Sequence, residues 1–131
     1  MNQIIQTVNK SVKLFFQPLH YFVILVLMYL IFDTETTGLP KRWDLPLKES
    51  ENWPRCIQIA WQIHDSNGAI ASHKDYLIKP DNFTIPFDSE KIHGISTALA
   101  SQEGFPLSKV LSEFKGALEK IKYIVGHNVS F

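Results

Sequence analysis

The chain has 131 residues, of which 45% are apolar and 12% aromatic, so it suits one folded domain and neither a disordered nor a fibrous protein. Thirteen basic and thirteen acidic side chains cancel, which excludes binding to nucleic acid by bulk neutralisation of phosphate and leaves only local binding. The single Cys56 excludes an internal disulfide and a cysteine-based zinc site, and it is compatible with a reducing, cytoplasmic location.

The first feature along the chain is an apolar run over residues 21–32, which follows Lys10 and Lys13 and superficially resembles a signal or anchor sequence. The run is shorter than the ~20 apolar residues that a bilayer-spanning helix needs. No small-residue cleavage site follows it, and its last five residues are required for the first strand described next. Membrane binding is therefore not expected, although a short membrane-associating segment remains an alternative.

Residues 28–32 form a short aliphatic and aromatic stretch typical of a buried strand, and Asp33 and Glu35 follow it. Side chains in a strand repeat with a period of two, so both carboxylates should project from one face. Neighbouring carboxylates repel, and a divalent cation between them offsets the cost of keeping both ionised. Residues 36–38 should then turn the chain out of the strand, because Gly38 can adopt a positive φ and let a ligand come close. The pattern predicts a site for hard metal ions at an open end of a sheet.

The middle of the chain predicts a loop and a hairpin. Residues 41–55 are rich in charge and proline and show no periodicity, as is typical of an exposed loop. The basic side chains of this loop could contact phosphate, although a solvated surface is favoured. Residues 56–64 alternate apolar and polar side chains, which indicates a half-buried strand. Asn67-Gly68 is a strong turn signal, so residues 70–79 should return as the antiparallel partner.

Two short helices are expected after the hairpin. Asp88 or Ser89 can cap the first, which should end at Gly94, and Ser96 or Thr97 can cap the second. Both helices are therefore predicted from capping residues and glycine rather than from a long apolar pattern.

The last third of the chain predicts a longer helix and a strand. Residues 107–121 repeat apolar side chains with helical spacing and place charged ones on the other face, so this helix should pack on the sheet. Residues 123–125 form a short strand. A right-handed crossover would set this strand parallel to residues 28–33, with its carboxyl end near Asp33. The order strand, hairpin, helices, strand predicts an α/β fold.

Residues 32–40 read Phe-Asp-Thr-Glu-Thr-Thr-Gly-Leu-Pro, His93 begins a His-Gly-Ile element, and residues 125–131 read Val-Gly-His-Asn-Val-Ser-Phe. In this order the three segments resemble motifs of the DEDD superfamily of 3′-to-5′ exonucleases, and within it the epsilon subunit of bacterial DNA polymerase III. Members commonly begin with a methionine shortly before the first motif, as Met28 would. Residues 1–27 are therefore expected to be an N-terminal extension or the result of a misplaced start, and residues 28–131 the N-terminal part of an exonuclease domain.

The resemblance implies a ribonuclease H-like fold, a mixed sheet flanked by helices, which is incomplete at the C-terminus because a further strand and helices of the family would follow Phe131. The remaining metal-binding acids of the family would follow there as well. The same resemblance implies two Mg²⁺ or Mn²⁺ ions, with Asp33 bridging both and Glu35 binding one, and phosphodiester hydrolysis at nucleic-acid 3′ ends in DNA replication or repair. Without the later acids, the 131-residue chain is expected to lack efficient catalysis. A noncatalytic fragment that binds nucleic acid or protein remains the alternative.

The resemblance also implies partners and contact residues. The partners are the 3′ end of single-stranded DNA or RNA and a DNA polymerase subunit. For His93, a packing role is as well supported as a place near the substrate. The residues expected to contact the terminal nucleotide are Thr36, Thr37, Gly38, Leu39 and His93.

Overall fold

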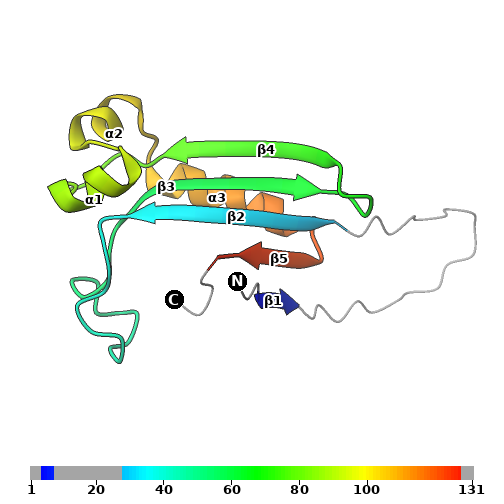
Figure 1. Cartoon of the computed structure of the whole chain (residues 1–131), viewed down its shortest axis with the longest axis horizontal. Coiled ribbons are helices and arrows are strands. Elements are labelled where there is room, and N and C mark those ends of the chain that lie inside the picture. Colours follow the sequence, from blue (N-terminus) through cyan, green and yellow to red (C-terminus); the bar gives the residue numbers. More distant parts are fainter. Residues whose placement is uncertain (1–3, 8–27, 128–131) are drawn as a thin grey trace, which may run out of the picture.

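The computed structural model describes residues 4–7 and 28–127, which form a mixed sheet with three helices (Figure 1). The strands lie side by side in the order β1-β5-β2-β3-β4. Strands β2 and β5 are parallel, and all other neighbours are antiparallel. The elements are β1 (Ile4–Thr7), β2 (Tyr29–Thr36), β3 (Cys56–His64), β4 (Ile70–Leu77), α1 (Phe87–His93), α2 (Thr97–Glu103), α3 (Leu107–Leu118) and β5 (Tyr123–Gly126).

One face of the sheet carries the main core, and α3 covers it. Buried and half-buried residues alternate along β3, so its apolar set faces one side, as predicted. Leu30 of β2 and Val110 of α3 are almost completely buried in the same cluster. In Figure 1, α3 lies behind the sheet, and none of the described helices covers the front face. The buried members of the cluster are Leu30, Ile59, Trp61, Ile63, Ile78 and Val110.

The two short helices dock at one end of the sheet, near the carboxyl ends of β2 and β4 (Figure 1). A second buried cluster joins them to β3 through Ile57, Ile85, Ile95 and Ala100. After α2 the chain pairs with the end of β4. Phe105 donates its N–H to the carbonyl of Leu77 (2.9 Å), and Lys79 donates to the carbonyl of Phe105 (2.9 Å).

Gly104 makes this close approach possible. A Cβ atom there would lie 2.2 Å from the carbonyl oxygen of Ala100 and 2.6 Å from the backbone nitrogen of Lys79. Backbone atoms cannot move aside as the end of a flexible side chain can, so the position requires glycine.

Several predicted boundaries shift. Strand β2 continues to Thr36, beyond the predicted end at Asp33, because its pairing with β3 carries the polar residues into the sheet. Helix α3 ends at Leu118 instead of at residue 121, and β4 ends at Leu77 instead of at residue 79.

The predicted caps of the short helices differ in outcome. For α2 the prediction is confirmed, since Ser96 accepts a hydrogen bond from the N–H of Leu99 (3.0 Å). For α1 it is wrong: Pro86 occupies the N-cap without a side-chain bond, and the helix begins before Asp88. The hydroxyl of Ser89 is used elsewhere, as described below.

The upstream segment contributes one described strand. β1 pairs antiparallel with β5, from Ile4 opposite Gly126 to Thr7 opposite Tyr123. The apolar run up to residue 27 and the last four residues of the second motif, 128–131, lie outside the described residues. Among the helices of the described ranges, none has the length and apolar character that a membrane span requires. The division into residues 1–27 and 28–131 stays a prediction.

Candidate functional site

Asp33 and Glu35 lie on the face of the sheet opposite to α3. Their cross-strand partners are Ala60 and Gln58, and the register of β2 with β3 is regular up to Glu35. Leu30, three positions before Asp33 on the same strand and therefore on the other face, is completely buried in the core. Asp33 is exposed and Glu35 is half-buried. The expected geometry, two carboxylates on one open face, is therefore what the structure has, whereas their role as metal ligands stays a prediction.

Neither carboxylate is neutralised by a cation among the described residues. The ion pairs of this part of the chain involve other acids, and Asp33 accepts only a local bond, from the N–H of Thr34 to Oδ1 (2.9 Å). Because no basic side chain of the described residues pairs with these two like charges, their attraction for a divalent cation is not offset. The donor chemistry, carboxylate oxygen, is the kind that Mg²⁺ and Mn²⁺ prefer.

A third carboxylate on the same face belongs to Asp75, which the sequence did not indicate. It lies opposite Ala60, in the same cross-strand row as Asp33, so two strand spacings, about 10 Å, separate the two Cα atoms. Its Oδ1 accepts a hydrogen bond from the side-chain amide of Gln58 (2.8 Å). Within residues 4–7 and 28–127, no group of three or more histidine, cysteine or acidic side chains could hold one ion. Asp75 is thus a neighbour of the pair and not a shared ligand.

Strand β5 brings the C-terminal segment to the acidic pair, as predicted from the crossover. Tyr123 lies beside Tyr29 and Gly126 beside Phe32, in parallel register. His127 follows at the exposed end of β5 and therefore lies alongside the level of Asp33. Segments from both ends of the predicted domain thus meet at this site.

The turn after β2 is tied to the start of β3. Thr37 donates its N–H to the carbonyl of Arg55 (2.9 Å), and the N–H of Arg55 donates to Oγ1 of Thr37 (2.9 Å). Thr36 closes the turn through a bond from its hydroxyl to the carbonyl of Gly38 (2.8 Å). Gly38 has φ of +134°, so the prediction of a positive φ is confirmed. The next side chain, Leu39, is 71% exposed and available to a ligand.

Helix α1 is fastened to this turn. The buried Ser89 donates its hydroxyl to the carbonyl of Thr37 (2.9 Å). A Cβ atom at Gly38 would lie 3.8 Å from Oγ of Ser89. This tertiary bond explains why Ser89 does not cap its own helix. The contact sets α1 beside the turn that follows Glu35.

His93 lies one turn after Ser89 on the same helix face. Its Nδ1 accepts the N–H of Ile95 (3.1 Å), which places the ring proton on Nε2. The Nε2 atom is buried and has no hydrogen-bond partner in the described part of the chain. The ring is therefore held by one bond and retains one unused donor, and its contact with substrate stays a prediction.

Two of the basic side chains in the long loop are paired with acids of the same loop. Arg42 forms a two-point contact with Asp44, at 3.0 and 2.6 Å, and Arg55 contacts Glu51 at 3.2 Å. The pairing favours the solvated-surface interpretation of this loop over contact with phosphate.

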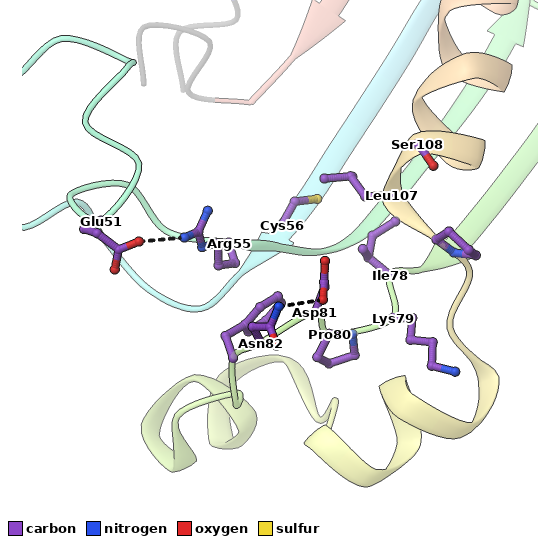
Figure 2. A pocket seen from close by; sticks show the side chains of 12 residues that line it. Glu51, Arg55, Cys56, Ile78, Lys79, Pro80, Asp81, Asn82, Leu107 and Ser108 are labelled. Carbon is purple, nitrogen blue, oxygen red and sulfur yellow. Dashed lines mark hydrogen bonds and ion pairs between the residues drawn. The ribbon is translucent and has the colours of Figure 1, made fainter.

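A groove of about 860 Å³ lies where β3 begins and β4 ends, between the end of the long loop and the start of α3 (Figure 2). It contains neither Asp33 nor Glu35. Its two basic residues, Arg55 and Lys79, are balanced by Glu51 and Asp81, so the groove favours no charge class of ligand. Burial raises the pKa of the Cys56 thiol in its wall.

The family model described as Exonuclease matches residues 30–131. No curated protein matches the sequence.

Solved structures of exonuclease I resemble the fold. One is described as SSB/exonuclease I in complex with the inhibitor CFAM (20% identity, 79% of this chain and 21% of that chain, TM-score 0.63). A product-bound exonuclease I has 21% identity over 79% of this chain and 22% of that chain, with a TM-score of 0.62. Exonuclease I of E. coli with a 5cy-dA13 oligonucleotide has 20% identity over 70% of this chain and 18% of that chain, with a TM-score of 0.55.

At these identities the likeness concerns the fold. It confirms the predicted class, a ribonuclease H-like α/β fold with a mixed sheet and flanking helices. The chain spans about one fifth of the length of the exonuclease I chains that it matches.

Proposed function

The chain belongs to the exonuclease family, and from this membership we propose that it forms part of a 3′-to-5′ exonuclease active site in which Asp33 and Glu35 bind divalent metal ions. The observation that carries the proposal is the placement of the two carboxylates. They share one open face of β2, lack a basic partner among the described residues, and lie where the parallel strand β5 ends.

The proposed ions are Mg²⁺ or Mn²⁺, two of them in the complete site. Asp33 and Glu35 fit such ions because both offer hard oxygen ligands that are accessible from solvent. When bound, the ions would supply an activated water and would offset negative charge on the scissile phosphate. Two carboxylates are fewer ligands than such ions require, so other groups must complete the coordination.

The chain's other residues would position the substrate. The turn of residues 36–38 presents backbone beside the carboxylates, since Gly38 carries no side chain that would block the approach. Leu39 offers an exposed apolar surface to the base or sugar of the terminal nucleotide. Helix α1 holds the turn in place through Ser89. Since Nε2 of His93 is buried, the ring would have to turn outward to contact the substrate.

The proposed substrate is the 3′ end of single-stranded DNA or RNA. Solved structures of exonuclease I include complexes with dT13 and dA16 oligonucleotides and with SSB, which supports a nucleic-acid ligand for this fold. A role in proofreading or repair, with a polymerase subunit as partner, rests on the resemblance of the first motif to the epsilon subunit. The cytoplasmic location is likewise part of the proposal.

Titration of the 131-residue chain with Mg²⁺ and Mn²⁺, followed by calorimetry, tests the metal site. We expect binding in the millimolar range that Asp33→Ala or Glu35→Ala abolishes. Asp75→Asn is the matched control, because it removes a charge from the same face about 10 Å away and should preserve binding. Ion binding that survives Asp33→Ala would exclude the proposed site.

The polarity is tested with two hairpin DNAs, one with a single-stranded 3′ tail and one with a 5′ tail, each with phosphorothioate linkages to prevent cleavage. We expect ion-dependent binding to the 3′ tail only. Binding that needs no ion and is unchanged in Asp33→Ala would instead support the interpretation as a noncatalytic interaction fragment.

A further inference from the structure

We propose that α1 carries a base-stacking subsite for the single strand that enters this site, formed by the ring of Phe87 with Lys91 beside it. The inference rests on the proposed function, because it concerns the same nucleic-acid ligand. The subsite adds a stacking contact that the turn of residues 36–38 does not provide.

Phe87 is a large aromatic side chain at the surface of a short helix. It is 68% exposed, although it stands at the first position of α1, next to residues that anchor the helix. The ammonium group of Lys91 lies 4.4 Å from the ring centroid, over one face of the ring. With one face covered by a cation and most of its area exposed, the ring leaves its second face open to another flat group.

The position of α1 relative to the acidic pair is fixed by a hydrogen bond. Ser89, two residues after Phe87, donates to the carbonyl of Thr37, which is two residues after Glu35. The stretch from Thr37 back to Glu35 spans about 7 Å, and that from Ser89 back to Phe87 about 5 Å. Because positions two apart lie on opposite sides of a helix, the ring of Phe87 points away from Ser89 and from the turn. A strand that leaves the acidic pair would reach the ring across α1, within the roughly four or more nucleotides that a single-strand site holds.

The charge of Lys91 suits the backbone of the same strand. Its only described ion pair, with Asp88, is long (3.8 Å) and fully at the surface, where the two side chains are 61% and 95% exposed. Such a pair contributes little and leaves the ammonium group available to a phosphate. An aromatic ring beside a lysine is the combination by which proteins bind single strands without reading their sequence.

Ile92 provides an internal comparison. It is also on α1 and is 84% exposed, but it has no π-system and lies on the opposite flank of the helix from Phe87. If α1 bound a protein partner through apolar contact, both side chains should contribute. If it stacks a base, only Phe87 should.

The test measures the affinity of the full chain for a 5′-labelled single-stranded oligonucleotide with phosphorothioate linkages, by fluorescence anisotropy in Mn²⁺. We expect Phe87→Ala to weaken binding roughly 5- to 150-fold, the range of one base–aromatic stack. Phe87→Tyr should restore most of the affinity, and Ile92→Ala should leave it unchanged. Circular dichroism checks that each variant is folded, which the exposure of both side chains favours.

Two further measurements separate stacking from charge. An abasic position scanned through the 3′-terminal nucleotides should weaken binding to the wild-type chain at one position, and this loss should vanish in Phe87→Ala. Lys91→Gln should lower the slope of log K against log salt by about 0.7, whereas Phe87→Ala should leave the slope unchanged.

The outcomes are distinguishable from failure of the proposed function. Equal affinity of Phe87→Ala and wild type, in binding that still requires Asp33, would overturn the stacking subsite alone. Equal losses in Phe87→Ala and Ile92→Ala would overturn it in favour of a general apolar contact. Absence of any ion-dependent binding by the wild-type chain would overturn both proposals.

Discussion

Removal of one carboxylate of the acidic pair is predicted to change the stability of the fold in opposite directions without and with divalent ions. Asp33 and Glu35 are two positions apart on one strand, so about 7 Å separates their Cα atoms. At that distance two unit charges in water repel by about 0.6 kcal/mol, and salt at 0.15 M reduces this to roughly 0.3 kcal/mol. In EDTA, Asp33→Asn should therefore raise the free energy of unfolding by about 0.3 to 0.6 kcal/mol.

Divalent ions should reverse this order. An ion present at ten times its dissociation constant stabilises the folded chain by RT ln 11, about 1.4 kcal/mol, if it binds the folded state alone. For a chain of this size that corresponds to a rise in melting temperature of about 4 to 8 °C. Asp33→Asn should lose most of the rise, so the wild type becomes the more stable protein in Mg²⁺ or Mn²⁺.

Thermal melts followed by circular dichroism in EDTA, MgCl₂ and MnCl₂ measure both effects on the same samples. Glu49→Gln, which removes an exposed carboxylate from the long loop, should respond to the ions as the wild type does. A lower stability of Asp33→Asn than of the wild type in EDTA would refute the predicted repulsion, because the carboxylate would then have a structural partner. Equal stabilisation of both proteins by the ions would refute the predicted metal binding by Asp33.

Three further predictions concern the framework of the site. Gly104→Ala should destabilise the fold by about 2 kcal/mol or more, because its Cβ would meet a backbone oxygen at 2.2 Å. Gly116→Ala, in open space on α3, should instead stabilise the fold by about 1 kcal/mol. Midpoints of urea unfolding that shift in the same direction for both variants would contradict this. Ser89→Ala should lower the free energy of unfolding by about 1 kcal/mol and weaken ion-dependent DNA binding, while Ser101→Ala, which removes an exposed bond within α2, should cost less than about 0.5 kcal/mol and leave DNA binding unchanged. Burial raises the pKa of Cys56, so the folded chain keeps the thiol protonated at pH values where the unfolded chain ionises it. The free energy of unfolding should therefore fall as the pH rises above about 8.5. In urea unfolding, Cys56→Ala should show a smaller fall over the same pH range than the wild type.

Periodicity in the sequence predicted the elements that bury one face. The alternation along β3 and the helical spacing along α3 both report which side chains enter the core, and both elements are present as expected. The same period of two predicted that Asp33 and Glu35 share a face. These predictions succeed because each depends on residues that are near one another in the chain.

The features that escaped prediction depend on tertiary contacts. Ser89 was expected to cap α1, but its hydroxyl bonds to Thr37, more than fifty residues earlier. The polar end of β2 has weak strand preference by itself and is extended by pairing with β3. Asp75 joins the open face only through the register of two hairpin strands. The pairing of β1 with β5 involves four residues, too few for a periodic signal.

The parallel pairing of β2 with β5 has a consequence for the order of folding. His64 and Ile70 of the hairpin are six positions apart, whereas Tyr29 and Tyr123 are 94 positions apart, so closing the longer loop costs about 2.4 kcal/mol more in chain entropy. The hairpin should therefore form early and the β2–β5 pair late. Until Gly126 has left the ribosome, the edge of β2 at residues 29–32, just before Asp33, has no partner, so during synthesis this edge is open to pairing with another chain.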